Sequence, residues 1–201
     1  MGSLISVIIN TCDAKDYMKN CIENVVNQTY KNIEILVIDN CVNDKISKIC
    51  SKYNDKRIKI IKESNNDHLK ILQSCINNSK GDYLYFVDAR DFLDDDVIEK
   101  LYNICLDYNV DVSLSDTANI YNYNYLNTSL KENIDIITGY QMINKEVMKN
   151  KKIDLFNKLI NKKVLETSLE NEKIDKIFLK IERIAFCNQK KYFYCRDGIA
   201  I

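Results

Sequence analysis

Carboxylates stand at two points where an apolar run of the sequence ends, and both could do chemistry. Asp88 and Asp91 follow the run 83–87, and Asp39 follows the run 33–38. Carboxylate oxygens are the ligands that hard divalent cations prefer. A Mg²⁺ or Mn²⁺ ion held this way commonly bridges to phosphates and stabilises a leaving diphosphate. Asp88 and Asp91 are therefore candidate metal ligands, and Asp39 is a candidate acceptor for a base imide or a ribose hydroxyl.

The same region has structural alternatives. Asp91 and the acidic run 94–96 can stand at the start of a helix, where negative charge complements the helix dipole. Asp39 can start a turn, because Asp bonds its own backbone there. The single histidine, His68, is expected in a loop or at a helix start, with a ligand contact as the alternative.

Composition excludes several classes of protein. The 201 residues carry 29 basic and 29 acidic side chains, so no net positive field draws a nucleic acid, and we expect no such partner. Four glycines at scattered positions cannot form a G-x-G-x-x-G loop or a P-loop. One histidine excludes multi-histidine metal sites. No run reaches the ~18 apolar residues of a membrane span, so we expect no transmembrane segment, while peripheral membrane contact and oligomeric state stay open.

Cysteine usage indicates the compartment. None of the eight cysteines forms a C-x-x-C pair, and most lie in apolar stretches. Buried free thiols pack as small hydrophobic groups and persist in a reducing environment. We therefore expect a cytoplasmic protein with free thiols at positions 12, 21, 41, 50, 75, 105, 187 and 195.

The first half alternates strand and helix patterns. Apolar runs predict strands over 4–9, 33–38, 57–61 and 83–87. Helical spacing predicts helices over 13–28, 45–53, 69–78 and 94–108. We expect Asp13 to cap the first helix and Gly81 to stand at the C-terminus of the third. Four such units predict an α/β fold with a parallel sheet between helices, whose ligands bind at the carboxyl ends of the strands.

The second half is less regular. Strands are predicted over 110–115, 118–125, 184–187 and 192–195, and helices over 138–150, 156–166 and 171–183, with Thr138 capping the first of these helices. No linker or repeat divides the chain. We expect a single domain over 1–201, with a ligand-binding half at 1–115 and an irregular half at 116–201.

Four segments carry a resemblance to a known family. They are SVIINTCDAKDYMKNCIENVVNQTYKNIEILVIDN at 6–40, NSKGDYLYFVDARDFLDDDVIEKL at 78–101, FNKLINKKVLE at 156–166 and IAFCNQKKYFYC at 184–195. In order and spacing they resemble the family 2 glycosyltransferases. That resemblance implies a GT-A fold, which is a mostly parallel, Rossmann-like sheet flanked by helices with an irregular acceptor-side second half.

The resemblance also implies an activity and a site. It implies sugar transfer from a nucleoside-diphosphate sugar, UDP type favoured, to a glycan, lipid or protein acceptor, with inversion through a general base. The acceptor's identity stays open. Asp88 and Asp91 match the metal-holding stretch. The nucleotide-binding candidates under this resemblance are Thr11, Cys12, Asp13, Asp39, Asn65, Lys70, Asp88, Ala89 and Arg90.

The sequence departs from the family pattern at several places, and three of these departures concern the metal, a basic residue and the base. Arg90 replaces the central acid of D-x-D; its charge weakens any Mn²⁺ or Mg²⁺ site and instead suits direct pairing with a diphosphate. The usual basic residue before this stretch is absent, and Lys70 can substitute for it. The acid pair that supplies the base has no clear match, which leaves Glu170, Glu172 and Asp175 as base candidates. A catalytically silent relative that acts as a binding or partner subunit is therefore the alternative.

Overall fold

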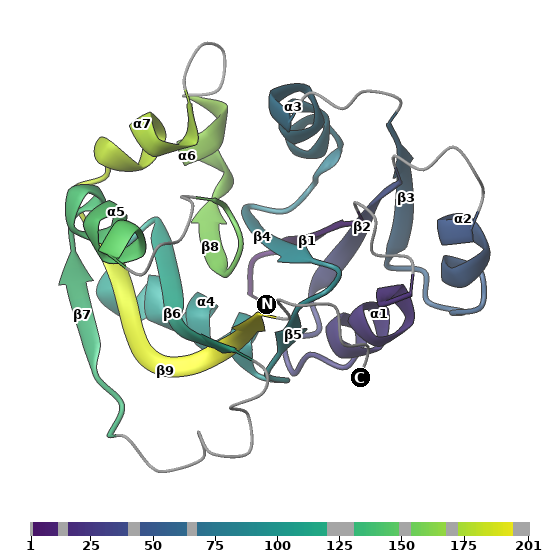
Figure 1. The fold of residues 1–201 in the computed structure, drawn as a ribbon, viewed down its shortest axis with the longest axis horizontal. Coiled ribbons are helices and arrows are strands. Elements are labelled where there is room, and N and C mark those ends of the chain that lie inside the picture. Colours follow the sequence, from purple (N-terminus) through teal and green to yellow (C-terminus); the bar gives the residue numbers. More distant parts are fainter. Residues whose placement is uncertain are drawn as a thin grey trace.

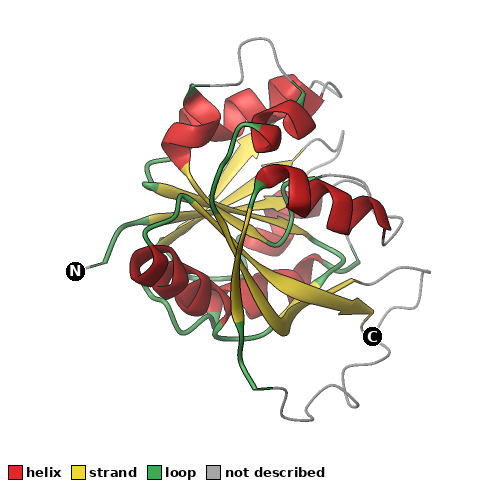
Figure 2. Ribbon diagram, turned by 90° about the vertical axis from the view of Figure 1, so that its left-hand side faces the viewer, coloured by secondary structure: helices red, strands yellow, loops and turns green. Residues whose placement is uncertain are grey.

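The computed structural model describes residues 2–11, 16–39, 45–63, 68–119, 131–148, 154–167 and 173–194. Within these ranges the chain builds a nine-stranded mixed sheet with helices on both of its faces (Figures 1 and 2). The strands are β1 (Ile5–Asn10), β2 (Ile33–Asp39), β3 (Ile58–Lys62), β4 (Tyr83–Asp88), β5 (Phe92–Leu93), β6 (Val112–Asn119), β7 (Ile134–Ile137), β8 (Lys158–Asn161) and β9 (Ile184–Tyr194). The helices are α1 (Met18–Val26), α2 (Lys45–Cys50), α3 (His68–Asn78), α4 (Val97–Tyr108), α5 (Gly139–Met148), α6 (Lys162–Glu166) and α7 (Ile174–Leu179).

The sheet joins the two halves of the chain through β4 and β8. Its strand order is β3-β2-β1-β4-β8-β6-β9-β5, and β7 pairs with β9. β1, β2, β3 and β4 are parallel, as predicted, whereas β5 runs antiparallel to β9. β8 runs antiparallel to both β4 and β6, so β6 points the same way as β4, and β9 is parallel to β6. The carboxyl ends of β1, β2, β3 and β4 therefore share one edge.

Two apolar layers cover the sheet. Successive strand residues point to opposite faces, so Val7 and Ile9 pack on the side of α1, α2 and α4, whereas Ile8 packs on the side of α3, α5, α6 and α7. Both layers exclude water from the strands, which explains why β1 and β2 are apolar without strict alternation. No helix in the described ranges is both long enough and apolar enough to cross a membrane.

Gly81 has a different role from the predicted helix end. α3 ends at Asn78, and the Gly81 N–H donates to the Ser6 hydroxyl at 2.9 Å. A Cβ at position 81 would lie 2.6 Å from the backbone nitrogen of Ser6. Only glycine therefore allows β1 to approach the start of β4 this closely.

Two helix starts in the first half also differ from prediction. α1 begins at Met18, and Asp13, its predicted cap, lies outside the described residues. α4 begins at Val97 without a side-chain cap. Asp94 and Asp96 instead form ion pairs with Lys191 of β9, at 3.0 and 2.8 Å. These two carboxylates are thus held by a strand far along the chain, a contact that the local sequence does not reveal.

The second half contains the larger errors. The predicted helix over 156–166 is a strand, β8, followed by the short helix α6, because Ile160 pairs with both Leu84 and Val112 in the sheet. The two strands predicted over 110–125 are one strand as far as the described residues go, and the last two are the single strand β9. β7, and β5 in the first half, were not predicted. Thr138 does cap α5: its hydroxyl accepts from the Gln141 N–H at 3.2 Å, and the Gln141 side chain accepts from the Thr138 N–H at 2.8 Å.

Candidate functional site

Polar side chains meet where the parallel strands end. In the register of the sheet, Asn10 of β1 stands between Ile38 of β2 and Asp88 of β4. Asp39, the next residue of β2, pairs with Lys62 of β3. The structure thus brings together at one edge the strand ends that the sequence analysis singled out, which is where ligands of α/β sheets bind.

Asp39 is a buried carboxylate at the end of β2. Its side chain is 0 % exposed, and the ammonium of Lys62 lies 3.9 Å from it. The Ser47 hydroxyl at the start of α2 lies 3.5 Å from the same oxygen, Oδ2. The hydroxyl of Thr11, the first residue after β1, donates to the carbonyl of Ile38 at 2.7 Å. A buried acceptor and a hydroxyl thus flank the end of β2.

A tight turn carries the chain out of β4. The Asp91 N–H donates to the Asp88 carbonyl at 2.9 Å, which closes the turn. The N–H of Ala89, a buried residue, donates to the Asn10 carbonyl at 3.1 Å and ties the turn to β1. The backbone of residues 88–91 is therefore held against the neighbouring strand.

Arg90 donates three hydrogen bonds to the Asp88 carboxylate across this turn. Its Nε donates to Asp88 Oδ1 at 2.9 Å and its Nη2 to Oδ2 at 2.6 Å, and its backbone N–H donates to Oδ1 at 3.0 Å. Charge-assisted, two-pronged pairs of this kind are among the stronger hydrogen bonds in proteins. The Arg90 side chain is 51 % exposed, whereas that of Asp88 is 13 % exposed. Part of the guanidinium, paired with Asp88, therefore faces the solvent at the end of β4.

Asp91 serves different partners. Its carboxylate accepts a hydrogen bond from the hydroxyl of Tyr192 in β9. Burial, followed by the charges of Asp88 and Asp91, raises the pKa of the Cys21 thiol. Burial, then the charges of Tyr194 and Asp91, raises the pKa of Tyr85 well above its usual value. The two carboxylates thus share an effect on Cys21 and differ in their bonds, since Asp88 pairs with Arg90 and Asp91 with Tyr192.

This arrangement weakens the expected divalent-cation site at Asp88 and Asp91. Both oxygens of Asp88 bond to Arg90, and Asp91 bonds to Tyr192. In the described ranges, no three His, Cys, Asp or Glu side chains gather as they would around a metal ion. A cation between Asp88 and Asp91 would also have to stand close to a guanidinium, which repels it.

The remaining predicted residues divide into two groups. Lys70 is exposed in the first turn of α3, which His68 begins. Asp175 is half-buried in the first turn of α7, which packs on α5. Five others lie outside the described residues: Cys12, Asp13, Asn65, Glu170 and Glu172.

Sequence reasoning missed two residues of the site. Lys62 is the last residue of β3 and faces Asp39. The rule that ligands bind at the carboxyl ends of parallel strands could have indicated this position. Tyr192 reaches the turn from β9, 104 residues along the chain from Asp88. Nothing local marks that contact, because it exists only once the sheet has formed.

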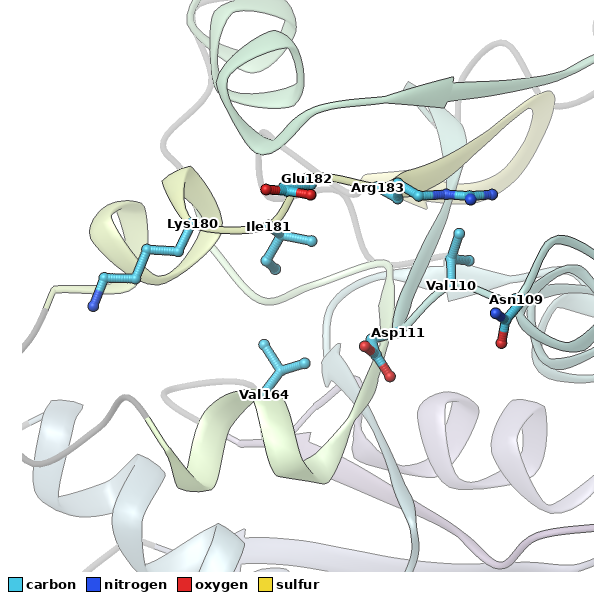
Figure 3. A pocket seen from close by; sticks show the side chains of 8 residues that line it. All are labelled: Asn109, Val110, Asp111, Val164, Lys180, Ile181, Glu182 and Arg183. Atoms are coloured by element: carbon cyan, nitrogen blue, oxygen red, sulfur yellow. The ribbon is translucent and has the colours of Figure 1, made fainter.

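A hollow of about 320 Å³ lies at the opposite edge of the sheet (Figure 3). It is built from the residues that precede β6 and β9, together with Val164 of α6. Because β6 points the same way as β4, the start of β6 lies at the edge away from Asp88. Its lining residues are Asn109, Val110, Asp111, Val164, Lys180, Ile181, Glu182 and Arg183. The hollow is therefore separate from the candidate site.

Comparison with known proteins places this geometry in context. The sequence model described as "Glycosyl transferase family 2" matches residues 6–169. "Glycosyltransferase GlyA" of Streptococcus pneumoniae serotype 4 is 28 % identical over 122 residues, which are 60 % of this chain and 17 % of that protein.

Solved structures resemble the chain over nearly its whole length. S. aureus TarS 1-349 in complex with UDP-GlcNAc has a TM-score of 0.76 at 19 % identity, over 99 % of this chain and 60 % of that one. A mannosyltransferase from Pyrobaculum calidifontis in complex with GDP-Man and Mn²⁺ has a TM-score of 0.67 at 14 % identity, over 94 % of this chain and 57 % of that one. The expected α/β fold of GT-A type is confirmed. The chain spans less than two thirds of each of these three proteins.

Proposed function

The chain belongs to glycosyl transferase family 2, and from that premise we propose that it transfers a sugar from a nucleoside-diphosphate sugar, of the UDP type, to a glycan, lipid or protein acceptor. The observation that carries this proposal is the meeting of Asp39 and the Asp88–Arg90 pair at one edge of the sheet. Residues 1–115 form the donor-binding half in this proposal, and residues 116–201 form the acceptor side.

The nucleoside lies over the ends of β1 and β2. Asp39 is buried, so a ligand N–H or O–H that reaches it forms a hydrogen bond shielded from water. The Thr11 hydroxyl stands beside it, fixed on the Ile38 carbonyl. The UDP and UDP-GlcNAc complexes of TarS, which shares this fold, support a uridine nucleotide as the ligand.

The diphosphate lies by the turn after β4. Arg90 presents a half-exposed guanidinium there, and guanidinium groups match phosphate oxygens in charge and geometry. When the donor bond breaks, negative charge develops on the diphosphate, and a positioned cation stabilises it. The mannosyltransferase complex, which holds Mn²⁺ together with GDP-Man, shows that one protein of this fold binds a metal with its donor. In this chain, we propose, Mn²⁺ or Mg²⁺ contributes weakly because Arg90 occupies Asp88.

Transfer with inversion needs a base that removes the acceptor proton as the acceptor oxygen attacks the sugar. Asp175, Glu170 and Glu172 remain the proposed candidates. Calorimetry with a panel of nucleoside diphosphates and their sugars, with Mn²⁺ and with EDTA, tests the binding step. Release of free sugar or of diphosphate from the same donors tests the chemistry.

A second candidate function has its own support. Arg90 stands where the family carries an acid, and its partner is Asp88 itself. The replacement of that acid by arginine is consistent with a protein that binds the donor sugar nucleotide without transferring or hydrolysing the sugar. Donor binding without hydrolysis or transfer, under conditions in which a family 2 enzyme is active, favours this silent relative.

A further inference from the structure

Tyr192 of β9 contacts the turn that follows β4. Its side chain is fully buried, and its hydroxyl accepts a hydrogen bond from the Asp88 N–H at 3.2 Å. The same hydroxyl donates to the Asp91 carboxylate, and burial, followed by the charge of Asp91, raises the pKa of Tyr192 well above its usual value. One hydroxyl thus joins both ends of the turn to β9.

We propose that Tyr192 is a positioning residue of the donor site: its hydroxyl sets where the Asp88–Arg90 pair stands relative to the ends of β1 and β2. This inference rests on the proposed function. Tyr192 acts through Asp88, whose backbone it holds and whose carboxylate anchors Arg90.

A neighbouring tyrosine shows that core packing alone does not require these bonds. Tyr85 of β4 is also fully buried in the same apolar layer. Its hydroxyl has no hydrogen-bond partner in the part of the chain that the structure describes. The ring of a tyrosine is enough to fill this layer, whereas the hydroxyl of Tyr192 places both of its bonds on the turn.

β9 holds the same stretch of chain at a second point. Lys191, the residue before Tyr192, pairs with Asp94 and Asp96. Between these contacts, Leu93 of β5 is aligned with Tyr192 in an antiparallel pair. The segment from Asp88 to Asp96 is therefore fixed on a strand that folds onto it from far along the chain, and Tyr192 supplies the contact nearest to Arg90.

The matched variants are Tyr192→Phe and Tyr85→Phe, each of which removes one buried hydroxyl from the same layer. Calorimetry with UDP measures affinity, and thermal melting checks that both variants fold. Tyr192→Phe should weaken UDP binding roughly fivefold, the factor that a loss of about 1 kcal/mol corresponds to. Tyr85→Phe should leave the affinity within twofold of wild type. In an Arg90→Ala background Tyr192→Phe should have little further effect, because both changes act on one contact to the ligand.

A second measurement needs no nucleotide. The Nε–H resonance of Arg90 in NMR spectra reports its bond to Asp88, and it should shift in Tyr192→Phe and stay in place in Tyr85→Phe. Equal UDP affinities in wild type and Tyr192→Phe would overturn the inference and leave the proposed function standing. Wild-type protein that binds no nucleoside diphosphate would remove the proposed function. In that case an unmoved Arg90 resonance in Tyr192→Phe overturns the positioning role as well.

Discussion

The Arg90 guanidinium bonds both oxygens of Asp88, at 2.9 and 2.6 Å, and its half-exposed side chain leaves part of the guanidinium facing the solvent at the end of β4. A second pair with the same spacing occurs elsewhere in the chain. Arg57 bonds Asp55 in the same way, at 3.0 and 2.6 Å, just before β3 and away from the strand ends. An arginine thus pairs with the aspartate two residues before it at two places in this chain. Only the Asp88–Arg90 pair lies at the carboxyl ends of the parallel strands, where it can contact a ligand.

Arg90 should make donor binding independent of metal. We expect wild-type protein to bind Mn²⁺ weakly and to keep its UDP affinity in EDTA, and Arg90→Asp to make that affinity depend on Mn²⁺. Two opposite charges about 4 Å apart near a protein surface interact by ~4 kcal/mol, enough to replace part of a metal's contribution. Isothermal titration calorimetry with Mn²⁺ and with EDTA measures both effects. Arg57→Asp, the matched control, should leave UDP binding unchanged; tight Mn²⁺ binding by the wild type, with UDP affinity lost in EDTA, would contradict this role.

Asp39 should contribute directly to nucleotide binding. Asp39→Asn keeps the side-chain volume but removes the charge and one acceptor, and we expect it to weaken UDP binding by roughly 1–3 kcal/mol. Glu34→Gln is the matched control, because Glu34 is the buried acid at the other end of β2 and pairs with Lys59 as Asp39 faces Lys62. Glu34→Gln should lower stability and spare affinity. Equal calorimetric affinities for wild type and Asp39→Asn would argue against a nucleotide at this edge.

The cysteines should be unreactive in the folded protein. The five that the structure describes are buried and free, and burial is the main cause that raises the pKa of Cys50 and Cys105 to about 11 and of Cys75 to about 12. Few thiolates are therefore available at neutral pH. Alkylation followed by mass spectrometry should label these sites slowly in native protein and all eight cysteines of the chain after denaturation without reductant. Fewer than eight labels in fresh denatured protein would contradict the free-thiol prediction.

Glu34 should make the free energy of unfolding fall as the pH becomes acidic. Burial alone would raise its pKa, but the Lys59 ammonium, the Lys80 N–H and the Ser6 hydroxyl outweigh burial and lower it. A lowered folded pKa means that the carboxylate adds stability above its unfolded pKa of about 4.3 and loses that contribution as pH falls through the folded value. Urea unfolding of wild type and Glu34→Gln should therefore differ at pH 6 and converge toward pH 3. A constant difference between the two proteins across this range would contradict the assignment.

Tyr85→Phe should stabilise the protein slightly. The Tyr85 hydroxyl is buried and, among the described residues, has no hydrogen-bond partner, so it carries a desolvation cost without compensation. Removing it should raise the free energy of unfolding by about 1 kcal/mol, which urea denaturation measures. A loss of stability of similar size would show that the hydroxyl has a partner in the folded protein.

The parallel half of the fold was predictable, whereas the mixed half was not. β1 and β4 lie in apolar layers on both sides, so their residues form continuous apolar runs that stand out in the sequence. The residues of β8 also fit the spacing of a helix, and only their pairing between β4 and β6 makes them a strand. Local patterns contain no information about such pairing.

The site divides in the same way. Asp39 and Asp88 are the last residues of β2 and β4, and the rule that ligands bind at the carboxyl ends of parallel strands placed both at one edge of the sheet. That Arg90 turns back onto Asp88 depends on the geometry of a single turn. The contact of Tyr192 depends on the whole sheet. The sequence thus predicted where Asp39 and Asp88 lie in the sheet, but not that Arg90 and Tyr192 bond to Asp88.

The distance of 104 residues between Asp88 and Tyr192 also matters while the protein is being made. A ribosome adds about 5–20 residues per second, so the end of β4 waits roughly 5–20 s before Tyr192 has been synthesised. Until residues 158–161 have been made, within that interval, β1 to β4 can pair with one another while β4 still lacks β8, its neighbour on the other side. A growing chain therefore exposes an unpaired strand edge for seconds, and this is the stage at which contact with other nascent chains carries the greatest risk of aggregation.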